Sequence, residues 1–352
     1  MVRRRNYITA LLSACGMIIL ILDSKTAVAG ATEGIEMCLR TVIPSLLPFF
    51  ILSIMLTSTA SGINIPFLRG LGTVCGIPKG SEHILLVGFL GGYPVGAQTV
   101  TQAYHSGHLT KQEAHRMLGF CSNAGPSFFF GLAGCLFSSK TTVLSLWIIH
   151  ILSAIIVAAI IPGKTGRTCE TNEAAPVTLP DALWKALRIM AGVCGWIIVF
   201  RILIAFIDRW FIWMFPESVR ILTMGLLEAA NGCIRLIQVQ SELTRYIICS
   251  VVLGFGGICV GMQTVYVTAE LGTGWYFPGK ILQTLFSFVL SSITAYFLFI
   301  KNANPIALIA VVSLLLLCIL CICKKTVAFL SNRVYNNTKQ ERNLYTCCFG
   351  KK

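Results

Sequence analysis

Two short stretches carry residue types that could bind a small solute inside a membrane. The first, Gly88-Phe89-Leu90-Gly91-Gly92-Tyr93-Pro94-Val95-Gly96-Ala97-Gln98, lies within an apolar region. Proline lacks a backbone donor and glycine adopts backbone angles that other residues avoid, so a helix should break between Gly91 and Pro94. In lipid, broken backbone is tolerated only where it is buried in protein or lines a watery cavity. The pattern predicts a kinked helix or, as we prefer, a re-entrant hairpin whose tip lines a substrate site.

The second stretch, Gly225-Leu226-Leu227-Glu228-Ala229-Ala230-Asn231-Gly232, lies further along the chain and matches the first by order. An ionisable group within the membrane is costly and is a functional candidate by default. Glu228 therefore predicts either a solute-coupled carboxylate or a structural partner for Arg201 or for backbone N–H groups. Arg201 lies close to the polar Asp208, and we expect its side chain to extend towards the membrane interface rather than to contact solute.

Two further breaks are predicted at Ser122-Asn123-Ala124-Gly125-Pro126 and at Leu253-Gly254-Phe255-Gly256-Gly257. Neutral polar groups on or near the breaks can bind a ligand or satisfy freed backbone groups. Helix N-termini at such breaks present free N–H groups and partial positive charge, which suits an anion. The predicted solute site consists of Gly91, Gly92, Tyr93, Pro94, Gly96, Gln98, Ser122, Asn123, Gly125, Glu228, Asn231, Gly256, Gly257 and Gln263.

Composition excludes an ordinary soluble domain. The chain has 352 residues, of which 55% are hydrophobic and only 12% are charged, against about 25% charged residues in soluble proteins. The net charge of +14 lies largely at the two ends, in Arg3-Arg4-Arg5 and in the tail from Lys324, so we read it as a mark of the cytoplasmic side rather than as a nucleic-acid surface. No nucleotide-binding loop, metal or cofactor site is predicted, which leaves secondary or passive transport.

The predicted segments divide the chain into six regions. These are an N-terminal transmembrane anchor (1–30), a first repeat (31–162), a polar inter-repeat loop (163–180), a second repeat (181–300), a final transmembrane helix (301–323) and a basic cytoplasmic tail (324–352). Each repeat is expected to begin with a short amphipathic helix, Ala31 to Arg40 or Asp181 to Arg188, followed by a separate span. The capping box Thr110-x-x-Glu113 predicts a helix that starts at Lys111. Ala27-Val28-Ala29 resembles a signal-peptidase site, but we favour an uncleaved anchor.

The distribution of Lys and Arg between the loops selects a topology. In one arrangement every apolar segment crosses the membrane; in the other the two glycine-rich segments return to the side from which they entered. The second arrangement places a larger share of the Lys and Arg residues on the cytoplasmic side, so the positive-inside rule favours it. The prediction is an all-α polytopic membrane protein with about eight transmembrane helices and two re-entrant hairpins, both termini cytoplasmic. The halves are then inverted repeats, a common plan of secondary transporters.

Three elements together resemble the sporulation integral membrane protein YlbJ family, of the nucleoside-transporter Gate group. They are Thr41-Val42-Ile43-Pro44-Ser45-Leu46-Leu47-Pro48-Phe49-Phe50, Gly91-Gly92-Tyr93-Pro94-Val95-Gly96-Ala97, and Glu113 through Asn123-Ala124-Gly125-Pro126. The resemblance implies a multi-pass protein of a bacterial cell membrane, in the mother-cell membrane around the forespore, that passes dipicolinic acid across the outer forespore membrane. Residue patterns by themselves do not indicate that substrate.

Alternative functions remain open at this stage. A nucleoside-like solute transporter and a non-transporting membrane scaffold needed for spore formation fit the same pattern. An enzyme is not predicted, because no Ser/His or paired-carboxylate arrangement is present. The expected partners are the lipid bilayer and a small anionic solute, without nucleic acid, and a homo-oligomer is compatible with this class of protein.

Overall fold

The computed structural model describes residues 2–60, 63, 65–163, 168 and 176–301 of the chain, and the described part is almost entirely helical. The predicted final helix beyond residue 301, the basic tail and most of the polar inter-repeat loop lie outside these residues. Five helices in the described residues are long and apolar enough to cross a membrane: Ser24–Ala60, Lys140–Ile160, Leu179–Trp210, Glu242–Val267 and Tyr276–Ile300. A multi-pass membrane protein is therefore supported, while eight crossings and two re-entrant hairpins stay a prediction.

The first long helix runs unbroken through the place where the sequence predicted two elements. It consists of α2 (Ser24–Met37), a π-helical turn (Cys38–Val42) and α3 (Ile43–Ala60). The expected boundary near Arg40 is absent because the N–H of Ile43 bonds the carbonyl of Cys38, which widens the helix just ahead of Pro44 and lets it continue. The stretch Ala27-Val28-Ala29 lies inside α2, which follows the exposed helix α1 (Val2–Leu22).

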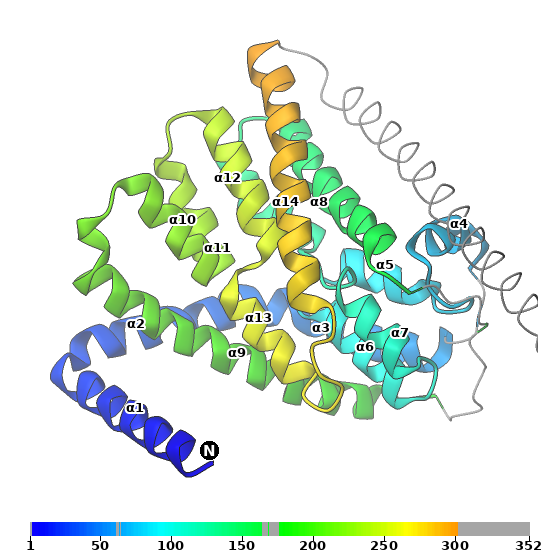
Figure 1. Ribbon diagram of the computed structural model, residues 1–352, viewed down its shortest axis with the longest axis horizontal. Helices are drawn as coiled ribbons and strands as arrows, with labels where there is room; N and C mark the ends of the chain where they lie inside the picture. Colours follow the sequence, from blue (N-terminus) through cyan, green and yellow to red (C-terminus); the bar gives the residue numbers. More distant parts are fainter. Residues whose placement is uncertain (1, 61–62, 64, 164–167, 169–175, 302–352) are drawn as a thin grey trace, which may run out of the picture. The chain divides into compact units, whose positions relative to one another are not determined.

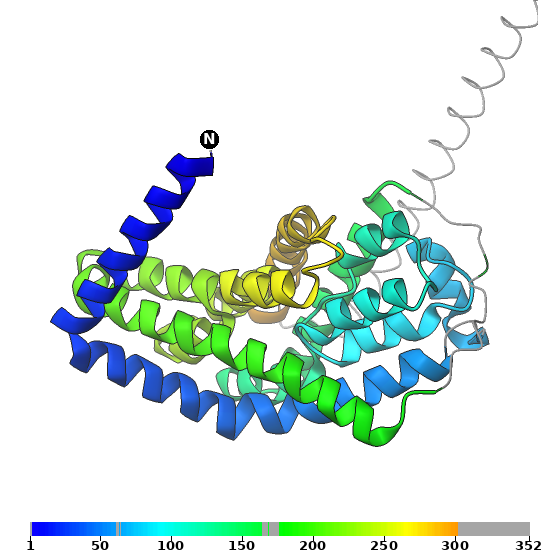
Figure 2. The ribbon, with the colours of Figure 1, turned by 90° about the horizontal axis from the view of Figure 1, so that it is seen from below.

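The second long helix, α9 (Leu179–Trp210), likewise fuses the predicted amphipathic helix and span into one. Helices α2 and α9 pack along each other over much of their length, as Figures 1 and 2 show. Gly30 and Gly34 make this contact close: a Cβ on Gly30 would lie 2.9 Å from the Arg201 carbonyl oxygen, and one on Gly34 would lie 2.9 Å from the Ile198 Cα. Small residues four apart are typical of closely packed membrane helices.

Both predicted glycine-rich breaks exist, and each joins two short helices that pack against each other. Helices α5 (Glu82–Leu90) and α6 (Val95–His105) flank the first break. Helices α10 (Glu217–Leu227) and α11 (Ala229–Arg235) flank the second, at which Glu228 has extended backbone angles. The geometry is that of two helical hairpins.

The remaining helices complete the same order twice. Helix α7 (Lys111–Leu118) begins with the predicted capping box, in which Thr110 and Glu113 cap each other, and leads through an irregular segment to η2 (Phe128–Leu132), η3 (Ala133–Leu136) and α8 (Lys140–Ile160). In the second half α12 (Glu242–Phe255) is interrupted at Gly256 before α13 (Gly257–Val267), and α14 (Tyr276–Ala295) follows. Helices α8, α12 and α14 pack together (Figure 1). The internal repeat and its inverted orientation stay predictions.

Short connecting elements fill the remaining described positions. These are α4 (Pro66–Cys75), η4 (Ile212–Met214), η5 (Leu236–Gln238) and η6 (Tyr296–Ile300). Helix α4 ends at Gly76, whose left-handed φ of 62° suits a glycine C-cap. Its residue Arg69 donates a hydrogen bond of 2.9 Å to the buried carboxylate of Glu82, which ties α4 to the start of the first hairpin.

Candidate functional site

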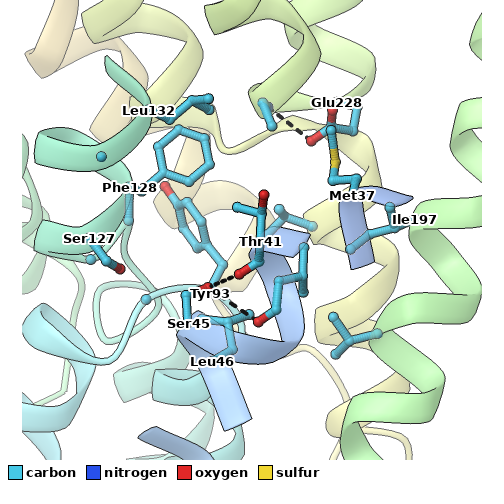
Figure 3. Close-up of a pocket in the computed structure, with 18 of the residues that line it drawn as sticks. Met37, Thr41, Ser45, Leu46, Tyr93, Ser127, Phe128, Leu132, Ile197 and Glu228 are labelled. Carbon is cyan, nitrogen blue, oxygen red and sulfur yellow. Dashed lines mark hydrogen bonds between the residues drawn. The ribbon is translucent and has the colours of Figure 1, made fainter. Parts of the chain in front are cut away.

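The first hairpin break, the Glu228 break and the segment 124–132 border one cavity of about 350 Å³. Residues of the long helices α2, α3 and α9 and of α13 close the remaining sides. Figure 3 shows Tyr93 and Phe128 on one side of the cavity and Met37, Ile197 and Glu228 on the other. The lining is predominantly apolar, with a few convergent polar groups: the hydroxyls of Thr41, Ser45, Ser127 and Tyr93, the Gln263 amide and the Glu228 carboxylate. This composition is typical of small-molecule sites.

Tyr93 joins the break of the first half to that of the second. Its hydroxyl donates a 2.6 Å hydrogen bond to the carbonyl oxygen of Leu253, in the last turn of α12. A Cβ on Gly256 would lie 3.2 Å from the Tyr93 ring, and Gly256 has φ of +84°. Glycine at this position therefore provides both the turn and the space for the ring.

A buried polar network lies behind Tyr93. The ammonium of Lys280 lies 4.9 Å from the centre of the Tyr93 ring and donates a 2.7 Å hydrogen bond to Gln283 Oε1. Gln283 Nε2 donates to Asn123 Oδ1 at 2.9 Å and to the carbonyl oxygen of His150 at 3.2 Å. All of these side chains are buried. Within the described part of the chain no carboxylate lies within ion-pair distance of Lys280, so this buried amine stands behind Tyr93 without a counter-ion.

Lys280 is not among the site residues predicted from the sequence. Helix α14 begins at Tyr276 and places Lys280 in its second turn. A signal was present in the sequence: Lys280, Gln283, Ser287, Ser291 and Thr294 follow one another at helical spacing and form a buried polar stripe on α14. A polar stripe along an otherwise apolar membrane helix indicates a face turned to the protein interior.

Glu228 caps the N-terminus of α11. Its Oε1 accepts a 2.9 Å bond from the backbone N–H of Ala230 and its Oε2 a 2.7 Å bond from that of Asn231. The side chain is buried and borders the cavity. Of the two roles predicted for Glu228, the structural one has these contacts in its favour, while a role in solute coupling stays a prediction.

The predicted site residues fall into two groups. Gly92, Tyr93, Gly125, Glu228 and Gln263 line the central cavity. The remaining predicted residues do not line it: these are Gly91, Pro94, Gly96, Gln98, Ser122, Asn123, Asn231, Gly256 and Gly257.

Several residues outside the central cavity have clear packing roles. Gly96 packs directly against the backbone carbonyl of Cys121, and a Cβ at position 96 would clash with that carbonyl oxygen. Asn123 donates bonds to the Phe120 and Gly88 carbonyl oxygens at 2.8 and 3.2 Å, which holds α5 against the break after α7. A Cβ on Gly257 would lie 3.1 Å from the backbone nitrogen of Ala229, so this glycine lets α13 approach the Glu228 break.

Asn231 and Arg201 line a second cavity of about 430 Å³. Its polar lining also includes Arg209, Arg235 and Asp208, supplied by α9 and α11. The Arg201 side chain is only 12% exposed and faces this cavity, and its extension towards the membrane interface stays a prediction. Arg201 stays inside because α2 packs directly over it through Gly30 and Gly34.

Comparison with known proteins adds one relative. The sporulation integral membrane protein YlbJ of Bacillus subtilis (strain 168) is 24% identical to this chain, and the alignment covers 73% of this chain and 74% of that protein. No family model matches the chain, and no solved structure matches it. The resemblance to the sporulation integral membrane protein YlbJ family, first drawn from three short elements, is thereby confirmed by an alignment over most of the chain.

Proposed function

We propose that this protein is a transporter or gate for a small anionic metabolite, with the central cavity as its solute site. The observation that carries the proposal is the meeting of the two hairpin breaks, one from each half of the chain, at one cavity. Broken helices that meet between repeats are where secondary transporters bind their solutes. The volume of about 350 Å³ lies at the small end of ligand sites, which suits a metabolite.

The charges around the cavity favour an anion. Both oxygens of Glu228 already accept backbone hydrogen bonds, so this carboxylate is partly neutralised by the end of α11. Lys280 lies behind Tyr93 with no counter-ion in the described residues. A buried cation is costly when it stands alone, and a solute carboxylate arriving at the Tyr93 side of the cavity offsets that cost.

Dipicolinic acid is the solute that we propose, in the membrane of the mother cell around the forespore. Its support is the likeness to a sporulation membrane protein, together with a cavity whose lining combines aromatic rings and hydroxyl groups. Tyr93 and Phe128 offer aromatic faces, and the Thr41, Ser45 and Ser127 hydroxyls can donate hydrogen bonds to carboxylates. Transport is secondary or passive, and the fold is that of two inverted repeats with re-entrant hairpins.

A cavity-filling variant with a matched control tests this function. Ser45 borders the cavity and its hydroxyl bonds the Thr41 carbonyl four residues earlier, at 2.6 Å. Thr59 lies on the same helix, is exposed, and bonds the Met55 carbonyl in the same way, at 3.0 Å. The parent chain and each variant are purified and reconstituted into proteoliposomes, and uptake of radiolabelled dipicolinate is measured. Ser45→Trp should abolish this uptake, and Thr59→Trp should retain it.

The rival functions give different results in the same assay. Uptake of a nucleoside but not of dipicolinate would assign a nucleoside-like transporter. Absence of uptake by the folded parent chain, combined with normal sporulation of a host carrying Ser45→Trp, would assign a non-transporting scaffold. For the proposed function we expect the Ser45→Trp host to form spores poor in dipicolinate while synthesis in the mother cell continues.

A further inference from the structure

The second cavity contains a guanidinium that lacks a partner suited to it. Arg201 makes no hydrogen bond within the described part of the chain, and its Nε is buried and unbonded. Within the described residues its one salt-bridge partner is Glu33, at 3.9 Å and with a side chain that is 66% exposed. Guanidinium groups carry five donors in a planar fork that matches a carboxylate. A buried fork of this kind, facing an open cavity, is a site for an anion.

The other arginines of this cavity are already paired. Arg235 donates to both oxygens of Asp208, at 3.3 and 3.0 Å, and through Nε to Asn231 at 2.8 Å. Arg209 lies 3.1 Å from Asp23. The lining thus holds Arg201, Arg209 and Arg235 against Glu33 and Asp208, which leaves an excess of positive charge. Of the three guanidinium groups, Arg201 has the most distant salt-bridge partner within the described residues, at 3.9 Å against 3.1 Å for Arg209 and 3.0 Å for Arg235.

The two cavities share a wall. Ile234 on α11 lines both of them. Along the long helices, Met37 and Ile197 face the central cavity, whereas Glu33 and Arg201, one helical turn away, face the second. The Arg201 charge also acts electrostatically on Glu228, which borders the central cavity. The second cavity therefore adjoins the solute site along the α2–α9 pair.

We propose that the second cavity is an entry site, in which a small dicarboxylate binds Arg201 before it passes Ile234 into the central cavity. This inference rests on the proposed function and adds to it a second binding site and a direction of approach. Arg201 raises the local concentration of anions in a low-dielectric recess. Ile234, at 49% exposed, is the residue that the anion must pass.

Labelling of a cysteine with charged reagents reports the electrostatic potential in the second cavity and does not require the protein to transport solute. A cysteine in Ile234→Cys should react faster with an anionic methanethiosulfonate than with a cationic one, after subtraction of the parent chain's own cysteines. Arg201→Gln should lower the anionic-to-cationic rate ratio roughly fivefold, the effect of one charge at about 8 Å in a watery cavity. Arg201→Lys keeps the charge and should keep most of the ratio. Ala205→Cys, on the α9 wall of the same cavity, is a second reporter in case Ile234→Cys does not fold.

Arg40→Gln is the matched control. Arg40 contacts Glu36 at 3.8 Å, close to the 3.9 Å that separates Arg201 from Glu33, and neither Arg40 nor Glu36 lines the cavity. It should leave the ratio almost unchanged. Dipicolinate should slow the labelling of Ile234→Cys, and this protection should be lost in Arg201→Gln. An unchanged ratio in Arg201→Gln, or protection that survives it, would overturn the entry site.

The labelling separates this inference from the proposed function. If the parent chain fails to transport dipicolinate but the ratio still depends on Arg201 and dipicolinate still protects, the dicarboxylate site stands and the transport function falls. If uptake is normal and the ratio is independent of Arg201, the entry site falls alone. The labelling is also compared in vesicles with and without phosphatidylglycerol. If dipicolinate protects Ile234→Cys only in vesicles without this lipid, a lipid phosphate occupies the cavity and the proposal is refuted.

Discussion

Replacing Lys280 should separate solute binding from folding. The ammonium is buried and has two described partners, the Gln283 side-chain oxygen at 2.7 Å and the Tyr93 ring at 4.9 Å. A hydrogen bond to a charged group contributes about 1.5–3 kcal/mol, and a desolvated cation–π contact about 2 kcal/mol. Removing an ammonium from water costs several kcal/mol even after relaxation. These terms nearly cancel, so Lys280→Met, which fills the same space without charge, should change the free energy of unfolding by no more than about 1–2 kcal/mol.

Removing the partner instead of the charge should have the opposite consequence. Gln283→Leu leaves the ammonium without its hydrogen bond and leaves Asn123 Oδ1 without its donor. Breaking a buried charged interaction from one side is expected to cost about 3–5 kcal/mol. Thermal unfolding in detergent should therefore show a small shift for Lys280→Met and a large loss for Gln283→Leu.

Solute uptake then decides what Lys280 is for. If its charge attracts the anion, Lys280→Met should raise the KM for dipicolinate tenfold or more while the protein remains folded, because one charge within a few ångströms at intermediate dielectric contributes more than about 1.4 kcal/mol. Lys280→Arg keeps the charge and should retain part of the affinity. A stable Lys280→Met protein with unchanged uptake would refute the argument, as would a loss of stability in Lys280→Met equal to that in Gln283→Leu.

Three further predictions follow from the same contacts. Tyr93→Ala should weaken dipicolinate uptake more than Tyr93→Phe, because the ring lines the cavity and faces Lys280. Tyr93→Phe should mainly lower thermal stability, because the hydrogen bond to Leu253 is lost. Equal uptake by both variants would exclude a role for the ring. Glu228→Gln keeps the shape of the α11 cap and should yield folded protein with impaired uptake, so normal uptake would leave Glu228 a structural cap. Cysteines at the exposed positions 112 and 162 should both be labelled from the cytoplasm. If position 112 is labelled from the outside while position 162 is labelled from the cytoplasm, the result would favour the topology in which every apolar segment crosses the membrane.

Local signals in the sequence located the breaks but not their surroundings. Gly91 to Pro94 and the Thr110–Glu113 box act within a few residues of themselves, so their consequences could be predicted directly. The continuity of α2 into α3 could not, because it depends on a π-helical turn that accommodates Pro44. The surroundings of Arg201 could not be predicted for a related reason. Its environment is set by α2 packing over it, and that contact requires Gly30 and Gly34 to meet α9.

The same limit applies to the site itself. Gly92, Tyr93, Gly125, Glu228 and Gln263 could be predicted because glycine, proline and polar residues within apolar segments mark exceptions to an unbroken helix. Lys280 could not be identified as a site residue from its position near a helix end. A lysine one turn inside a helix and a lysine just outside it have nearly the same neighbours in the sequence. The periodic polar stripe on α14 distinguishes the two, because it fixes which face of the helix is turned inward.

Tyr93 is the point at which the two halves depend on each other. Its hydroxyl is bonded to Leu253 in the second half, and its ring covers Lys280 from the same half. In a transporter of inverted-repeat design, one half moves against the other around a fixed site, and such a movement must break the bond between Tyr93 and Leu253. The net contribution of a hydrogen bond of this kind is only about 0.5–1.5 kcal/mol when another partner is available. Under the proposed function, a solute carboxylate in the cavity would be such a partner for the hydroxyl, so binding of the anion would both compensate Lys280 and release the contact between the first hairpin break and the end of α12.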